Sequence, residues 1–213
     1  MFGNEAKQTI TVRASISTVT LWQASLLPAF IEAYPGINVR LVSTIWGNSI
    51  AEEDVDIDLR IGYGDWPGMQ AEKISTETVV PVSALDGNQS IGSSTDLLQQ
   101  PHIYILGHED SWETYLSTHG LVAESSHIRY MVDTTATALA LAAAGGGIAI
   151  IITRFVDAAI HSGCAVSVVG DPVEFPQSHY FVNPVNQSAP RPEVRLLKSW
   201  IRSVFDESVG GLR

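Results

Sequence analysis

Strand-like and helix-like segments alternate along the first third of the chain, and this alternation limits the folds that the sequence can adopt. Residues 10–14 alternate apolar and polar side chains with the period of two that is typical of a strand. Residues 20–34 carry apolar side chains at helical spacing, on a face that comprises Trp22, Leu26, Phe30 and Ala33. The segments expected next are a strand at 39–43, a short polar helix at 49–53 and a strand at 57–61. The order β-α-β-α-β predicts a parallel sheet with right-handed crossovers.

The rest of the chain repeats this order, which predicts a second α/β unit. The expected strands cover 79–82, 103–106, 128–132, 148–152 and 166–169, and the expected helices cover 112–119, 134–144 and 153–162. Residues 148–152 are apolar without alternation, which predicts a strand buried on both faces. Residues 145–147 are three glycines after an alanine-rich helix, so they should end that helix and not cradle a phosphate. A strand at 179–182 follows, then a last helix with an apolar face of Val194, Leu197, Ile201, Val204 and Phe205.

The charge balance argues against DNA binding by this stretch of chain. The 213 residues include 12 Lys and Arg against 23 Asp and Glu, so the formal net charge is 12 − 23 = −11. Surfaces that bind nucleic acids are basic because they neutralise phosphates. We therefore expect no nucleic acid to bind this stretch on its own.

The single cysteine and the apolar segments bear on the cellular compartment. Cys164 stands alone, which excludes an internal disulfide and indicates a buried thiol in a reducing compartment. Residues 1–8 contain no apolar leader segment. The longest apolar run, 139–152, is interrupted by glycines and is too short to span a bilayer. The expected location is cytoplasmic, with no membrane partner.

No catalytic or metal-binding constellation stands out in the sequence. The histidines show no metal-type spacing and are expected at the surface or at helix caps: His102, His108, His119, His127, His161 and His179. No nucleotide-binding glycine motif and no G-x-S-x-G elbow occur. The sequence therefore predicts a protein that is not an enzyme, without a cofactor or a bound metal.

The segment DVDIDLRIGYGDWPGM, residues 54–69, resembles a family pattern, DVDLAIRYGDGDWPGL. That pattern is found in the effector-binding domains of LysR-type transcriptional regulators, in the subgroup of glycine-cleavage and β-lactamase regulators. Further similar segments, in the same order as in the family, are 26–30, 34–35, 39–41, 79–82, 112–116, 133–135 and 143–149. Two departures stand out: the family's usual arginine falls at Gly62, whereas this chain has Arg60, and the following turn is shorter.

The resemblance implies a periplasmic-binding-protein type II-like fold, an α/β fold in which two βα subdomains are joined by two extended crossings. Subdomain I would comprise 1–80 and 179–213, and subdomain II would comprise 81–178. The family carries a helix-turn-helix before the first strand, so we expect that this chain is part of a longer regulator. It would sense a small effector and control DNA binding by that helix-turn-helix, as a homodimer that becomes a tetramer in the full-length form. The alternative is a stand-alone solute-binding protein of a transporter.

The candidate effector site consists of polar residues at helix starts and strand ends of both predicted units, converging on a cleft between them. Helix amino termini offer free N–H donors and partial positive charge, which suits a carboxylate or an amide. The candidates are Ser17, Thr18, Thr20, Thr44, Trp46, Gly62, Tyr63, Asp133, Thr134, Thr135 and Tyr180. Ser, Thr and Asp are also the ordinary N-cap residues of helices, so each could serve as a cap instead. Trp66, Trp112 and Trp200 are interpreted as core or interface residues.

Overall fold

A computed structural model describes residues 8–44, 55–86, 91–122, 127–186 and 189–208. The chain divides into two compact units: unit 1 comprises Met1–Thr76 and Pro176–Arg213, and unit 2 comprises Glu77–Phe175. It therefore passes from unit 1 to unit 2 after Thr76 and returns after Phe175. The boundaries expected from the sequence lie after residues 80 and 178.

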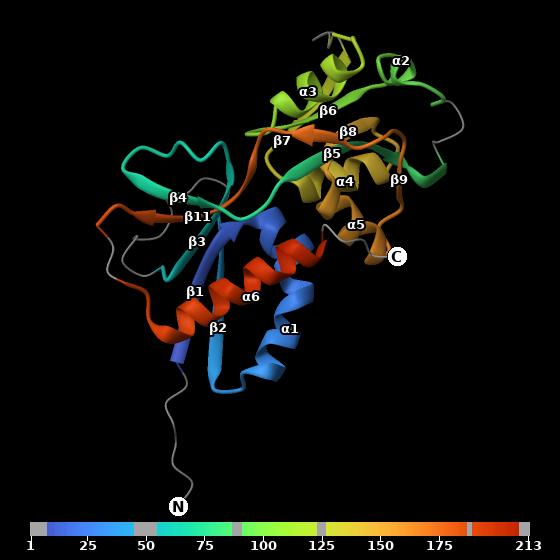
Figure 1. Ribbon diagram of the computed structural model, residues 1–213. Helices are drawn as coiled ribbons and strands as arrows, with labels where there is room; N and C mark the ends of the chain where they lie inside the picture. The colour runs from blue at the N-terminus through green and yellow to red at the C-terminus, as the bar shows by residue number, and fades with distance from the viewer. Residues whose placement is uncertain (1–7, 45–54, 87–90, 123–126, 187–188, 209–213) are drawn as a thin grey trace, which may run out of the picture. The chain divides into compact units, whose positions relative to one another are not determined.

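Unit 1 is built on a mixed five-stranded sheet in the order β2-β1-β3-β11-β4 (Figure 1). Its strands are β1 (Gln8–Ser15), β2 (Ile37–Thr44), β3 (Ile57–Gly62), β4 (Met69–Lys73) and β11 (Ser178–Pro184). β1 runs parallel to β2 and β3, which confirms the predicted parallel core, while β11 runs antiparallel to β3 and β4. The sequence did not predict β4, because its alternation is short and rests on two apolar residues, Met69 and Ala71.

Three helical segments belong to unit 1: the π-helix η1 (Thr18–Gln23), α1 (Ala24–Ala33) and α6 (Pro192–Ser208). Figure 1 shows α6 beside α1, and the rings of Phe30 and Trp200 lie 5.3 Å apart. Phe30 is buried as predicted, whereas Ala33, the last residue of α1, is exposed. The apolar face predicted for α6 is confirmed, since four of its members are buried: Val194, Leu197, Ile201 and Phe205.

The two faces of the unit 1 sheet differ in polarity. Ile57 and Leu59 of β3 are buried, and so is Asp58 between them, so β3 does not simply alternate buried and exposed residues. Because successive side chains of a strand point to opposite faces, Asp58 lies on the face opposite the apolar pair. Arg13 of β1 is paired with Asp58 in the strand register and is also buried. This charged pair is discussed with the site below.

Unit 2 contains a six-stranded sheet with the path β10-β5-β8-β6-β7, and β9 also pairs with β5. The strands are β5 (Glu77–Ala84), β6 (His102–Ile105), β7 (Ile128–Val132), β8 (Ile148–Ile152), β9 (Val166–Val168) and β10 (Val173–Phe175). β6 runs parallel to β7 and β8, whereas β5 runs antiparallel to β8, β9 and β10. All residues of β8 are buried, as its unbroken apolar sequence predicted.

Helices cover both faces of the unit 2 sheet, with α3 on one face and α4 and α5 on the other (Figure 1). Their bounds are α2 (Ser94–Leu97), α3 (Asp110–Thr118), α4 (Thr135–Ala143) and α5 (Thr153–His161). The glycines after α4 end it as predicted: Gly145 has a φ of 80° and Gly147 a φ of 129°. The short helix α2 was not predicted. Its start carries a capping box between Ser93 and Asp96.

Three further expectations from the sequence concern residues 46–53, Cys164 and membrane-spanning helices. The polar helix expected at 49–53 and the candidate residue Trp46 lie outside the described residues. Cys164 is half-buried and free, so its thiol is less enclosed than expected. Among the described residues, no helix is both long and apolar enough to cross a bilayer.

Candidate functional site

The three parallel strands of unit 1 end at one edge of its sheet. The register pairs Ser15 of β1 with Thr44 of β2, and Ala14 of β1 with Leu59 of β3. The carboxyl ends of these strands therefore meet. The described candidates of unit 1 lie at this edge or in the segments next to it: Ser17, Thr18, Thr20, Thr44, Gly62, Tyr63 and Tyr180. Carboxyl ends of parallel strands are where open α/β sheets bind ligands.

The π-helix η1 starts at this edge, and its hydroxyl groups have different environments. Ser17 is the N-cap residue, although its side chain makes no capping hydrogen bond. Thr18 is fully buried, and its Oγ1 lies 2.8 Å from the Oγ of Ser15. Thr20 is exposed and donates its hydroxyl to the Ile16 carbonyl at 2.8 Å. Thr20 therefore lies within the helix and does not cap it.

An aromatic cluster surrounds the end of β3. A Cβ atom at Gly62 would lie 2.8 Å from the ring of Trp66, and one at Gly64 would lie 2.8 Å from the ring of Tyr180. The two rings meet edge to face, with centroids 5.6 Å apart, and the Tyr180 hydroxyl donates to the Tyr63 carbonyl at 3.3 Å. A ligand that reaches this strand end would meet aromatic rings, because the indole of Trp66 covers Gly62. Tyr63 is 54% exposed.

Arg60, the arginine that departs from the family pattern, is held by an acidic residue. Its Nη2 lies 2.7 Å from Oδ2 of Asp58, and its guanidinium lies 5.7 Å from the centre of the Trp66 ring. Asp58 also accepts from Arg13, whose Nη2 lies 2.6 Å from the same oxygen. Asp58 therefore serves two arginines. Of these, Arg13 is buried and Arg60 is partly exposed.

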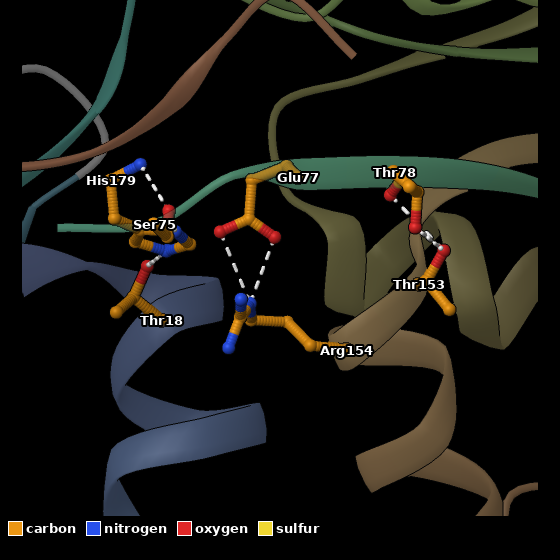
Figure 2. A network of polar contacts seen from close by, with 7 residues as sticks. All are labelled: Thr18, Ser75, Glu77, Thr78, Thr153, Arg154 and His179. Carbon is orange, nitrogen blue, oxygen red and sulfur yellow. Dashed lines mark hydrogen bonds and ion pairs between the residues drawn. The ribbon is translucent and has the colours of Figure 1, made fainter. Parts of the chain in front are cut away.

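A buried histidine, His179 of β11, connects three segments of unit 1 (Figure 2). Its backbone N–H donates to Oγ of Ser75 at 2.9 Å, and its carbonyl accepts from the backbone N–H of Ile74 at 2.9 Å. Its ring Nε2 lies 3.4 Å from Oγ1 of Thr18 at the start of η1. The expectation that the histidines lie at the surface or at caps is wrong for His179, which is 0% exposed.

In unit 2 the start of α4 holds the remaining candidates. Thr134 is the N-cap residue, and its Oγ1 accepts from the backbone N–H of Thr137 at 3.2 Å. Thr135 is buried and Asp133 is exposed. This helix start follows β7, and β7 is parallel to β6, so it lies at the carboxyl edge of the parallel strands.

These environments predict different stability losses for two threonines. Thr134→Ala removes a real N-cap and should lower the free energy of unfolding by about 0.5–2 kcal/mol. Thr20→Ala removes an exposed side chain bonded back to its own helix, and its effect should be within about 0.5 kcal/mol. Urea denaturation of both variants measures the difference. Equal losses would show that the Thr134 hydroxyl contributes nothing as a cap.

A second polar group in unit 2 was missed by the sequence analysis (Figure 2). Nε of Arg154, at the start of α5, donates to Oε2 of Glu77 at 2.8 Å, and both side chains are largely buried. Beside them the hydroxyls of Thr78 and Thr153 lie 2.7 Å apart. Thr153 and Arg154 directly follow the buried strand β8, which is the sequence signal that could have identified them. The signal for Glu77 is weaker, because it precedes its strand's apolar run.

These groups have the chemistry needed to bind a ligand through hydrogen bonds. Hydroxyls, helix starts and arginines can donate hydrogen bonds to oxygen atoms of a ligand. Among the described residues no group of three or more His, Cys, Asp or Glu side chains is arranged to hold a metal ion.

His102, at the other end of β6, is buried, contrary to expectation, and this burial lowers the pKa of its imidazole.

Comparison with known proteins shows a similarity that covers nearly the whole chain. Residues 3–206 match the family model described as LysR substrate binding domain. The chain is 27% identical over 199 residues to the glycine cleavage system transcriptional activator of Escherichia coli K12, covering 92% of this chain and 65% of the relative. It is also 27% identical over 198 residues to the transcriptional activator AmpR of Enterobacter cloacae, covering 92% and 66%.

A solved structure shows the same fold. The effector domain of the transcriptional regulator AmpR of Pseudomonas aeruginosa superimposes with a TM-score of 0.83 at 20% identity, covering 95% of this chain and 96% of that domain. The chain spans about 65% of the length of the first curated relatives that it matches.

Proposed function

Because the chain belongs to the LysR substrate-binding domain family, we propose that it is the ligand-sensing domain of a LysR-type transcriptional regulator. In this proposal a small effector binds the domain and alters DNA binding by a helix-turn-helix in another segment of the same protein. The observation that carries the proposal is the family match over residues 3–206.

The regulator proposal is favoured over a solute-binding protein of a transporter and over an enzyme. The relatives reported above are named as transcriptional activators. The net charge of −11 also fits a domain that leaves the contact with DNA to another segment. The full-length regulator would act in the cytoplasm, as a dimer or a tetramer.

The proposed effector contacts form two groups, one at the carboxyl edge of each unit's parallel strands. The start of η1 and the start of α4 each place hydroxyl groups beside backbone N–H groups, of which those of Thr18 and Thr137 donate to Ser15 and Thr134. Donors of this kind favour a small molecule with a carboxylate, phosphate or amide oxygen. The proposed contacts are Ser17, Thr18, Thr44, Gly62, Tyr63, Asp133, Thr134, Thr135 and Tyr180, together with Thr20 and Trp46 as weaker candidates.

The proposal is tested by separating affinity from stability. A thermal-shift screen of small metabolites identifies a ligand, and calorimetric titration then compares the parent with Thr134→Ala and Tyr180→Phe. If each hydroxyl binds the effector, its loss should weaken binding by about 1–3 kcal/mol, roughly a five- to hundred-fold rise in Kd. Affinities are corrected for the folded fraction.

Ser203→Ala is the matched control, because Ser203 is an exposed hydroxyl on α6 that donates only to the carbonyl of Trp200. It should leave the Kd unchanged. Equal affinities for the parent and all three variants would remove Thr134 and Tyr180 from the site. An upstream reading frame that encodes a secretion signal in place of a helix-turn-helix would overturn the regulator proposal itself.

A further inference from the structure

His102 of unit 2 has the environment of a metal-binding histidine. Its side chain is 0% exposed, and its ring stacks on the indole of Trp112, with centroids 3.8 Å apart and planes 19° apart. Its Nε2 lies 3.1 Å from the carbonyl oxygen of Leu97. A carbonyl oxygen only accepts hydrogen bonds, so Nε2 must carry the proton. Histidine ligands of metals are usually held through such a bond from their second ring nitrogen to a carbonyl or a carboxylate.

The other ring nitrogen of His102 is left with a bare lone pair. Nδ1 is buried and has no hydrogen-bond partner among the described residues. The Nδ1 atom of the neighbouring His127 is buried and also has no partner in the described part of the chain. A buried polar atom without a partner loses its hydration without compensation, which is unfavourable. Two such atoms therefore lie on neighbouring rings.

The separation of the two rings fits one shared metal ion. Their centroids lie 5.4 Å apart, and their planes are inclined by 55°. In a tetrahedral zinc site each nitrogen lies about 2.0–2.1 Å from the ion and about 1.2 Å from its ring centre, which places two ring centroids about 5 Å apart. We propose that His102 and His127 bind a transition-metal ion of the zinc class through their Nδ1 atoms.

The donor set defines the class of ion and the openness of the site. Neutral imidazoles favour Zn²⁺, Cu²⁺ or Ni²⁺, whereas Mg²⁺ and Ca²⁺ prefer oxygen ligands. The two histidines supply half of a tetrahedral set, so water or a small exchangeable ligand fills the other positions. His127 is half-buried as a residue, whereas its Nδ1 atom is enclosed.

This site is independent of the proposed effector contacts. His102 is the first residue of β6, and His127 immediately precedes β7, so both lie at the amino ends of these parallel strands. The effector contacts proposed for unit 2 follow the carboxyl end of β7. Spacing in the sequence did not suggest the pair, because the histidines come from separate segments that the sheet brings together.

Titration with ZnCl₂ tests the proposal. The complete 213-residue chain, without an affinity tag and stripped of metal with a chelator that is then removed, is titrated calorimetrically in a non-chelating buffer. We expect one Zn²⁺ per chain, at least tenfold weaker binding for His102→Gln and for His127→Gln, and no heat of binding with MgCl₂ at the same concentration. Excess Zn²⁺ should raise the Tm of the parent but not that of His127→Gln.

His161→Gln is the control, since His161 is an exposed histidine of α5 and should leave Zn²⁺ binding unchanged. If the stacked His102→Gln variant does not fold, the half-buried His127→Gln variant still decides the outcome. Absence of Zn²⁺ binding by the parent would overturn the proposal. Equal Zn²⁺ affinity for His127→Gln and the parent would also overturn it, by placing the ion on other surface groups.

Discussion

Replacing Asp58 with Ala should lower the free energy of unfolding by about 3–5 kcal/mol. Asp58 is the acidic partner of both Arg13 and Arg60, and Oδ2 lies within 2.7 Å of Nη2 of each arginine. The Arg13 side chain is 3% exposed, so without Asp58 it would remain buried with its nearest countercharge removed. Removing one partner of a buried ion pair is far more destabilising than removing an exposed one.

Arg60→Ala is the comparison that isolates the buried pair. The Arg60 side chain is 19% exposed, and its removal leaves Asp58 still bonded to Arg13, so a loss of about 1 kcal/mol is expected. Urea denaturation followed by far-UV circular dichroism measures both variants. If Asp58→Ala costs no more than Arg60→Ala, Asp58 does not stabilise Arg13 in the way described.

Gly147→Ala should destabilise the protein at least as much as Asp58→Ala. The expected decrease in the free energy of unfolding is about 4 kcal/mol or more. Gly147 has a φ of 129°, which strains any residue with a side chain, and its Cβ would lie 2.0 Å from the carbonyl oxygen of Pro101. That oxygen accepts a hydrogen bond from the backbone N–H of Ile148 at 2.9 Å, next to the pairing of Ile148 with His102. Relief of the clash would displace the start of β8.

Gly145→Ala provides the matched control, because it also replaces a glycine of positive φ after α4. Its φ is 80°, and no atom lies within 4 Å of the position of the added Cβ. The cost should therefore be that of the left-handed conformation alone, about 1–2 kcal/mol. Thermal and urea unfolding of the two variants compare them directly. A Gly147→Ala loss similar to that of Gly145→Ala would show that the Pro101 carbonyl yields easily.

The strands and helices were largely predictable because they depend on local periodicity. β8 is apolar throughout and is buried throughout, and the apolar stripe of α6 is the one that its sequence indicates. β4 was missed because it joins the sheet through β11, a strand more than a hundred residues away in the chain. Its own apolar residues are Met69 and Ala71, which give only a short alternating signal.

The candidate site was less predictable, because side-chain environments depend on partners that are distant in the sequence. Thr20 and Thr134 look alike in the sequence, since both are threonines near an expected helix start. Only the structure separates them: Ile16 and Ser17 are already helical, which places Thr20 inside the helix, while Thr134 caps α4. His179 appeared to be a surface residue because its partner Ser75 lies 104 residues away.

Gly62 illustrates the same limit for the shape of the site. From its position at a strand end, Gly62 was predicted to be one of the effector contacts. The structure covers it with the indole of Trp66, a residue that the sequence analysis assigned to the core or to an interface. A contact that depends on how a turn folds back over its own strand cannot be read from the period of that strand.

The discontinuity of unit 1 has a consequence for the order in which the protein forms during synthesis. Unit 2 is a single stretch whose first residue, Glu77, pairs with its last, Phe175, so every strand of its sheet has been made once Phe175 leaves the ribosome. Unit 1 begins earlier but must wait, because β11 lies between β3 and β4 and is synthesised after the whole of unit 2. Since domains fold as units during translation, the inserted unit can mature while the unit around it still lacks an internal strand. The apolar face of β1 and β3 therefore stays uncovered, and open to aggregation, until residues 178–184 and α6 have been synthesised.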